Sequence, residues 1–185
     1  NYKRALELDP DDQRSLSAYA TTLHKLARYA EAAVEFDKLV QKNTGDARTL
    51  FNASLPYLES DNNQKAVELL LKSADADTSA DAGYRSRAYK LAGPRLIKMG
   101  RTAEAQKCYR WLVEREPDVC DHRQWYGFTL FSTKDYKAAV PHLQKAYKCN
   151  EQQGGNECKF NELRWWLGYA LYEVGQKDDA YKLLE

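Results

Sequence analysis

The sequence predicts an all-α protein in which antiparallel helical hairpins stack on one another. Two observations carry this prediction. One apolar pattern recurs along the chain, and its spacing of i, i+3, i+4 and i+7 is that of one face of an amphipathic helix. Each occurrence is followed by a short turn and a second helical pattern, so the repeating unit is a helical hairpin.

The pattern is clearest in three segments, residues 16–23, 89–96 and 123–130. Each segment has a small residue at the same position, which lets two helices approach closely. These small residues are Ala20, Gly93 and Gly127. An alanine follows nine residues after each segment, and a large apolar residue comes four positions later. These pairs are Ala32 and Phe36, Ala105 and Tyr109, and Ala139 and Leu143.

The pattern divides the chain into a partial unit at residues 1–12 and five units after it. We place these units at residues 13–46, 47–80, 86–119, 120–153 and 161–185, the last without its end. The register slips by five residues around 78–85 and by seven around 152–160, where we expect extensions of loops or helices.

Some positions depart from the pattern. Ser73 stands in the 47–80 unit where a small apolar residue is usual. Pro56, Pro94 and Pro141 fall inside predicted helices. Because proline lacks a backbone N–H, we expect these helices to kink there.

These residues resemble the tetratricopeptide repeat, a family of helical hairpins of roughly 34 residues. The resemblance covers nearly the whole chain and implies a right-handed α-solenoid, with a single array over residues 1–185. Since the first element starts within a helix and the last helix has no polar cap, we expect a fragment of a longer protein that continues beyond residue 185.

Composition and motifs narrow the class of function. With 28 basic and 27 acidic side chains the formal net charge is +1, so no nucleic-acid partner is expected. No apolar run approaches the roughly 18 residues of a membrane-spanning helix, so no direct membrane insertion is expected. The chain has no glycine-rich phosphate loop, G-x-S-x-G or H-E-x-x-H motif. We therefore predict that it is not an enzyme and needs no cofactor.

A metal site is not expected either. Cys120 and His122 lie two residues apart and would supply two ligands. Tetrahedral zinc needs four ligands, so a polar helix start is the favoured interpretation.

The resemblance implies a concave face lined by one stripe of each first helix. Spacings of three, four and three keep such side chains on one face of the helix. The stripe is basic in the N-terminal half and aromatic in the C-terminal half. The partner-binding residues expected on it are Arg14, Arg48, Phe51, Arg87, Lys90, Phe128, Phe131, Trp165, Tyr169 and Tyr172. The alternative is that the aromatic residues pack on adjacent helices and the arginines are solvated.

This stripe predicts a scaffold or adaptor that binds a peptide or protein surface with acidic and aromatic or apolar segments. Some family members clamp the acidic tail of heat-shock chaperones. Asn52 and Arg87 suit that clamp, but Ser17, Thr21 and Leu91 do not, which argues against this ligand. The alternatives are a structural spacer or self-assembly module, or the regulatory region of a larger enzyme. The oligomeric state is left open.

The cysteines bear on the compartment. Cys149 ends one hairpin and Cys158 precedes the next, and a double glycine between them allows a disulfide of about 2–3 kcal/mol. The alternative is two reduced thiols. The bridge would indicate an oxidising compartment, and together with the many tyrosines and tryptophans it favours a bacterial envelope or periplasm. A cytoplasmic location is nearly as well supported. Cys108 is expected to be a small core residue.

Overall fold

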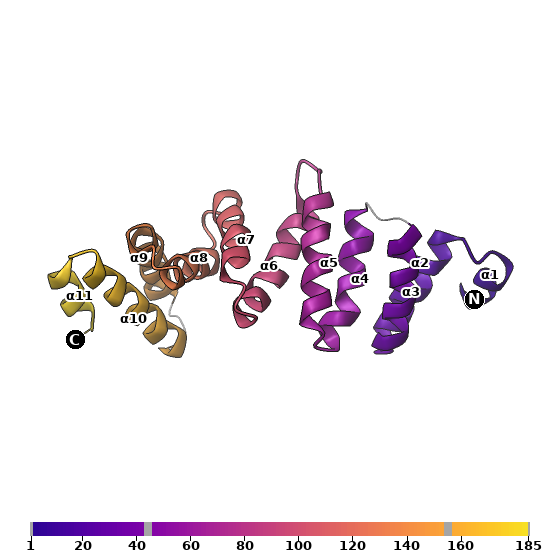
Figure 1. The fold of residues 1–185 in the computed structure, drawn as a ribbon, viewed down its shortest axis with the longest axis horizontal. Coiled ribbons are helices and arrows are strands. Elements are labelled where there is room, and N and C mark those ends of the chain that lie inside the picture. The colour runs from indigo at the N-terminus through magenta and orange to yellow at the C-terminus, as the bar shows by residue number, and fades with distance from the viewer. Residues whose placement is uncertain (1, 43–45, 154–156, 185) are drawn as a thin grey trace. The chain divides into compact units, whose positions relative to one another are not determined.

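Every element that the structure describes is an α-helix. The computed structural model describes the backbone of residues 2–42, 46–153 and 157–184, and the side chains of these residues except residue 3 and residues 153–160. In chain order the helices are α1 (Tyr2–Leu8), α2 (Gln13–Lys25), α3 (Tyr29–Lys42), α4 (Ala47–Glu59), α5 (Asn63–Ala76), α6 (Gly83–Lys98), α7 (Thr102–Arg115), α8 (Cys120–Ser132), α9 (Tyr136–Gln153), α10 (Glu157–Glu173) and α11 (Lys177–Leu184) (Figure 1). The predicted all-α fold class is confirmed.

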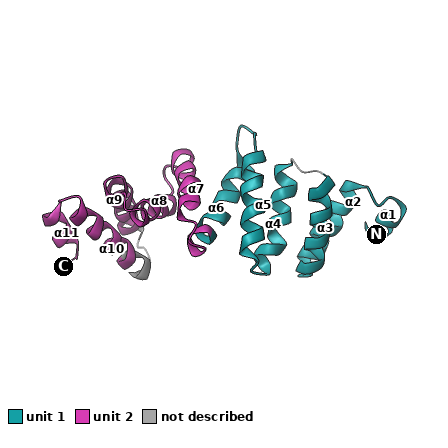
Figure 2. Cartoon of the chain, viewed as in Figure 1, with its two compact units in different colours: residues 1–95 teal, residues 96–185 magenta. Residues whose placement is uncertain are grey.

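The chain forms two compact units, residues 1–95 (unit 1) and residues 96–185 (unit 2), coloured separately in Figure 2. In unit 1, α2 packs on α3, α3 on α4 and α4 on α5. In unit 2, each helix from α7 to α11 packs on the next. The first helices of neighbouring hairpins also touch, α2 with α4 and α8 with α10. Sequential contacts of this kind define a solenoid of stacked hairpins. The division into repeats at the ranges given above stays a prediction.

The turns inside the hairpins share one backbone geometry. Each contains one residue in the left-handed region, and the following N–H donates to a carbonyl five residues earlier, as in a Schellman ending. The left-handed residues are Ala27 (φ 57°), Asp61 (φ 55°), Gly100 (φ 73°), Lys134 (φ 63°) and Gly175 (φ 87°). Glycine fills only two of these positions, which explains why the sequence gives no uniform turn signal.

The core of each unit consists of the positions that the apolar pattern selects. In unit 1 the buried cluster includes Leu16, Ala20, Leu23, Ala32, Phe36 and Leu39. In unit 2 it includes Leu130, Ala139, Leu143 and Ala146. Both helices of a hairpin therefore direct their apolar stripe inward, which is how an amphipathic hairpin stacks on its neighbours.

The two departures noted in the sequence have structural outcomes. Ser73 is completely buried, and its hydroxyl donates to the carbonyl of Ala47 at 2.7 Å, so it joins α5 to the start of α4. The helices run on through Pro56, Pro94 and Pro141 without a break in helical assignment.

Candidate partner-binding surfaces

The ten predicted contact residues divide between the two units. Unit 1 holds the basic ones together with Phe51, and unit 2 holds the other aromatic ones. The surfaces are therefore built up separately, one unit at a time.

In unit 2 an aromatic cluster forms where α8 ends, α9 begins and α10 passes. It consists of Phe131, Tyr136, Trp165 and Tyr169, and is called the Trp165 cluster below. The Phe131 ring lies 5.5 Å from Tyr136, 5.7 Å from Trp165 and 5.6 Å from Tyr169, centroid to centroid. Trp165 and Tyr169 are four residues apart on α10, so they share a face and stack at 5.6 Å.

The Trp165 cluster stays open to solvent. Trp165 is 52% exposed and Tyr169 is 39% exposed, while Phe131 and Tyr136 are half-buried. Trp165 and Tyr169 thus contact other rings and stay exposed, whereas Phe131 and Tyr136 also pack against the core of unit 2. The expected alternative, in which the aromatic residues pack on adjacent helices, therefore fits Phe131 and Tyr136 but not the two exposed rings.

That alternative does describe Phe128. Its ring lies 4.6 Å from Trp166 and 5.8 Å from Trp125, and Trp125 in turn stacks near the buried Tyr109. Phe128, Trp125 and Trp166 are half-buried and Tyr109 is buried. These four residues are called the Trp125 cluster, and they connect α7, α8 and α10. Phe128 therefore belongs to the packing of unit 2 more than to its surface.

Tyr172 lies apart from the Trp165 cluster. It is 43% exposed and pairs with Tyr181 of α11 at 6.4 Å. The Nζ of Lys177 lies 5.2 Å from the Tyr172 ring centroid, a cation–π distance. Within the Trp165 cluster, a hydrogen bond to the Glu173 carboxylate raises the pKa of Tyr169.

In unit 1 the predicted residues gather around a tyrosine that the sequence argument missed. Arg48 Nε donates to Tyr84 Oη at 3.2 Å, and the Phe51 ring lies 5.7 Å from that of Tyr84. The Arg87 guanidinium carbon lies 5.9 Å from the Tyr84 ring centroid. These four residues, from the first helices of two successive hairpins, form what is called the Tyr84 group. Both arginines in it are exposed.

The Tyr84 group borders an open pocket of about 650 Å³ at the start of α4 and the start of α6. Asp77 closes one side. It is 5% exposed and accepts hydrogen bonds from the backbone N–H groups of Tyr84 and Arg85, both at 2.9 Å. Burial raises the pKa of this carboxyl, but hydrogen bonds from Ser79 and from these N–H groups outweigh it and leave the pKa lowered. Asp77 therefore fixes the start of α6 and the position of Tyr84.

The other two basic residues predicted for unit 1 do not join this group. Arg14 and Lys90 are exposed on α2 and α6. The structure thus brings together Arg48, Phe51 and Arg87 in unit 1, and Phe131, Trp165 and Tyr169 in unit 2.

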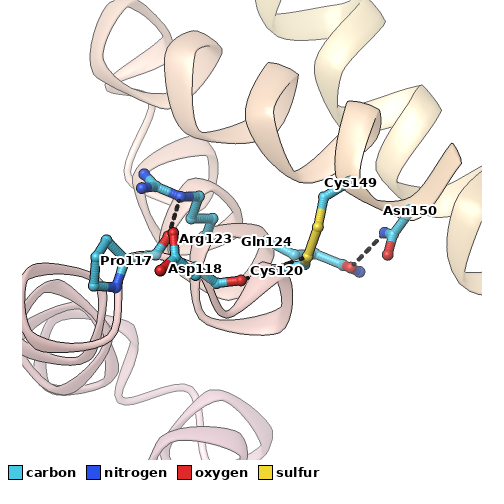
Figure 3. The surroundings of a disulfide bond; sticks show 7 residues. All are labelled: Pro117, Asp118, Cys120, Arg123, Gln124, Cys149 and Asn150. Atoms are coloured by element: carbon cyan, nitrogen blue, oxygen red, sulfur yellow. Dashed lines mark hydrogen bonds between the residues drawn. A yellow bond between two sulfur atoms is a disulfide. The ribbon is translucent and has the colours of Figure 1, made fainter. Parts of the chain in front are cut away.

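The disulfide prediction needs correction. Cys149 is joined to Cys120, with 6.1 Å between the Cα atoms, and not to Cys158 as the loop length suggested (Figure 3). The side chain of Cys158 lies outside the described residues. Cys120 begins α8 and Cys149 lies near the end of α9, so the antiparallel hairpin brings them level with each other. Sequence proximity favoured the wrong partner because it ignored this pairing of helix ends.

Several expected absences concern the described part of the chain only. There, no group of three or more histidine, cysteine or acidic side chains is placed to hold a metal ion. His122 Nδ1 instead faces Glu116 Oε2 at 3.7 Å. None of the described helices combines the length and apolarity needed to cross a bilayer.

The sequence argument did not find three residues of these two sites, Tyr84, Asp77 and Tyr136. Tyr84 and Asp77 lie in or beside the segment where the register slips, so no stripe position marked them. Asp77 follows α5 directly and precedes the first residue of α6 by six residues, so it does not occupy the N-cap position that a sequence pattern would reveal.

Comparison with known proteins also identifies helical hairpin repeats. Two models of the family described as tetratricopeptide repeat match the chain, over residues 90–154 and over residues 1–33. Among solved structures, YrrB, described as a TPR protein with an unusual peptide-binding site, superposes with a TM-score of 0.73 at 16% identity, covering 100% of this chain and 89% of that one.

Structures of MamA are also similar. One gives a TM-score of 0.65 at 21% identity, covering 83% of this chain and 86% of that one. Another, MamA AMB-1, gives 0.71 at 14% identity, covering 95% and 90%. At these identities the likeness concerns the fold. No curated protein sequence matches the chain.

Proposed function

Because the chain belongs to the tetratricopeptide repeat family, we propose that it is a non-catalytic scaffold that binds a peptide or protein segment, with the Trp165 cluster as its main contact surface. The observation that carries this proposal is the exposure of stacked rings. Trp165 and Tyr169 keep 52% and 39% of their surface open although each contacts other aromatic residues.

Such a surface suits recognition for physical reasons. Aromatic side chains offer a large contact area and have few rotatable bonds, so little conformational entropy is lost when a partner orders them. Here the cost is lower still, because Phe131 and Tyr136 already hold Trp165 and Tyr169 by ring contacts. A partner segment with apolar or aromatic anchors would cover these rings and gain the free energy of removing them from water.

The Tyr84 group of unit 1 is proposed as a second, separate contact for acidic side chains. Arg48 lies at the hydroxyl of Tyr84 and Arg87 lies near its ring, so two exposed arginines border one tyrosine. Guanidinium groups bind carboxylates through paired N–H donors. YrrB, which has a similar fold, is described as a TPR protein with an unusual peptide-binding site, and this supports a peptide ligand for the present chain.

The proposal can be tested by selecting peptides from a random display library on the whole chain and measuring their affinity by fluorescence anisotropy. The double variant W165A/Y169A should weaken the selected peptides by about tenfold or more, as expected when central aromatic anchors are removed. Circular dichroism should show unchanged helicity, because both side chains are surface residues.

The matched control is Y181A, which removes an equally exposed tyrosine (55%) outside the Trp165 cluster. It should leave peptide affinity within about twofold, since a surface position away from the contact contributes little. Equal losses in Y181A and W165A/Y169A would contradict the assignment of the surface. If the chain instead forms concentration-dependent oligomers in light scattering that persist in W165A/Y169A, the self-assembly alternative replaces the scaffold.

A further inference from the structure

The Cys120–Cys149 disulfide lines a pocket of its own, apart from both aromatic clusters. The pocket measures about 310 Å³. Its lining consists of Pro117, Asp118, Cys120, Arg123, Lys145 and Cys149. As whole residues, Cys149 is half-buried and Cys120 is buried at 8% exposure, so the approach to the disulfide is more open on the Cys149 side.

Each cysteine has a cation one helical turn away on its own helix. Arg123 follows Cys120 by three residues, and Lys145 precedes Cys149 by four, spacings that place side chains on the same face. Figure 3 shows Arg123 held toward the carbonyl of Pro117, to which its Nε donates at 2.9 Å.

The two cations act on a common region. Burial lowers the pKa of His142, and the positive charges of Arg123 and Lys145 lower it further. Asp118 also borders the pocket, as one carboxylate against two cations. The pocket therefore favours anions.

The position of Cys120 adds a chemical preference. It is the first residue of α8, where the helix dipole stabilises a thiolate. A disulfide opens faster when the sulfur that leaves is the more stable thiolate. Attack on Cys149 with departure of Cys120 is thus favoured both by access and by the leaving group.

We propose that the Cys120–Cys149 disulfide is a reducible modification site that is opened by small thiols of net negative charge, which enter beside Lys145 and attack Cys149.

In the first step the thiolate attacks Cys149 Sγ, the bond between the two cysteine sulfurs breaks, and its electron pair leaves on Cys120 Sγ. In the second step another thiolate attacks the small-molecule sulfur of the mixed disulfide and releases Cys149. Two thiols are oxidised to one small disulfide, one protein disulfide is reduced, and the two protons of the thiols end on Cys120 and Cys149.

The test begins with peptide mapping of the non-reduced full chain by mass spectrometry, which should recover a peptide pair joined through Cys120 and Cys149. The rate of opening is then measured with reduced glutathione, a thiol of net negative charge, and with cysteamine, a positively charged thiol, each rate being expressed per thiolate. The variant K145Q should slow opening by glutathione by about twofold to fivefold, the size expected for one exposed charge. Opening by cysteamine should not slow.

The matched control is K137Q, which removes the same charge from an exposed site on the same helix but outside the pocket. It should leave both rates unchanged, because its charge is screened over that distance. Equal slowing by K145Q and K137Q, or equal slowing of both thiols in K145Q, would overturn the proposal. So would mapping that finds Cys149 joined to Cys158, or Cys120 and Cys149 both reduced in protein kept under air.

Discussion

Unit 1 and unit 2 are stacks of the same helical hairpin, but they join their helices by different chemistry. In unit 1, polar side chains reach the backbone of a neighbouring element. The Ser73 hydroxyl donates to the carbonyl of Ala47, and Arg85 Nε donates to the carbonyl of Ala74 at 2.8 Å. Asp77 accepts hydrogen bonds from two backbone N–H groups of α6. In addition, Tyr57 Oη donates to Asp37 Oδ2 at 2.7 Å, between α4 and α3.

In unit 2 the joints are mainly apolar or covalent, although Asn150 Nδ2 of α9 also donates to the buried Gln124 Oε1 of α8 at 3.2 Å. A Cβ added to Gly127 would lie 2.7 Å from Leu143 Cδ2, so α8 and α9 touch where glycine leaves no side chain. The Trp125 cluster packs three helices together, and the Cys120–Cys149 disulfide closes the open end of the α8–α9 hairpin.

The difference teaches that the hairpin pattern specifies which positions are buried. It does not specify which contacts join one helix to the next. In unit 1, polar side chains form contacts between helices, and arginine side chains are exposed on the surface. Unit 2 is joined mainly by apolar packing and the disulfide, and leaves aromatic rings on its surface. The contacts that join the helices of a unit therefore determine which side chains remain exposed to bind a partner. Four changes test this view.

The largest effect is expected from reducing the Cys120–Cys149 disulfide. A cross-link at a sequence separation of 29 should contribute about 3 kcal/mol by restricting the unfolded chain. Hydrogen-exchange mass spectrometry with and without reductant should show α8 and α9 losing protection while α4 and α5 keep theirs. Equal loss in both units would show that their stabilities are not separate, and the comparison would fail.

An exchange at one register position comes next. Ser54 in unit 1 and Gly127 in unit 2 occupy the same place in the pattern. The Gly127→Ser variant should cost about 2 kcal/mol of unfolding free energy, because its Cβ would also meet the Leu143 backbone nitrogen at 3.2 Å. The Ser54→Gly variant should cost about 1 kcal/mol, the usual penalty of glycine in a helix.

Urea unfolding of both variants measures this difference. If Gly127→Ser is as stable as the original chain, the helices of unit 2 can move apart freely, and the close contact is not what joins them.

The outcome for Gly127 also shows what sequence could predict. The small residue at this position and the apolar residues around it follow the helical period, so the hairpins and their core were predictable. The specific contacts between helices were not, because they depend on where helix ends meet in space. Cys149 pairs with Cys120 across the hairpin, and Tyr84 enters its group from outside the stripe. The aromatic character of the unit 2 surface was predicted, but the internal role of Phe128 could not be read from its spacing.

A change in the joint of unit 1 should have a smaller effect. Replacing Asp77 by asparagine removes a charged acceptor of two backbone N–H groups at the start of α6, at a cost of about 1 kcal/mol. Since the folded state lowers the pKa of Asp77, its contribution is present above the unfolded pKa of about 3.9 and is lost as pH falls through the folded value.

Thermal unfolding at about pH 7 and about pH 3 separates the two forms. Asp77→Asn should lower the melting temperature at the higher pH and matter less at the lower one. Asp75→Asn changes an exposed aspartate of α5 two residues before Asp77. This control should leave the melting temperature unchanged at both pH values. A loss that is the same at both pH values would mean that the charge of Asp77 plays no part.

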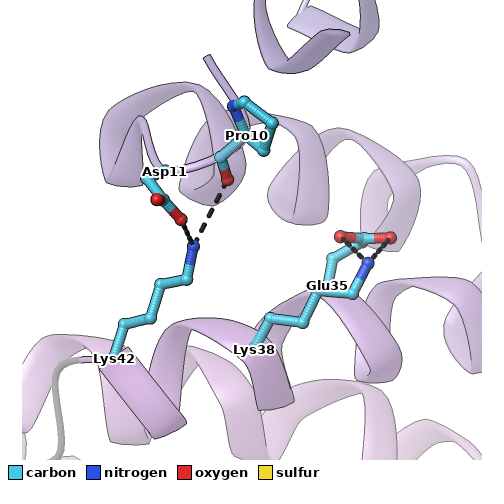
Figure 4. Close-up of polar contacts among 5 residues, drawn as sticks. All are labelled: Pro10, Asp11, Glu35, Lys38 and Lys42. Carbon is cyan, nitrogen blue, oxygen red and sulfur yellow. Dashed lines mark hydrogen bonds and ion pairs between the residues drawn. The ribbon is translucent and has the colours of Figure 1, made fainter.

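The smallest effect is expected where unit 1 is held by exposed charges alone. Figure 4 shows Lys42 reaching from α3 to Asp11 and to the carbonyl of Pro10, while Lys38 pairs with Glu35 one turn away. Lys42→Gln should cost about 0.5 kcal/mol and Lys38→Gln less, since solvent and salt screen such pairs. Urea unfolding at low and high salt measures both. Because Asp11 is 85% exposed, a cost for Lys42→Gln well above about 1 kcal/mol would require a contribution beyond a surface ion pair. The stability of unit 1 would then depend on its surface charges as much as on its side-chain-to-backbone hydrogen bonds. The contrast with unit 2 would lie between charged and apolar surfaces.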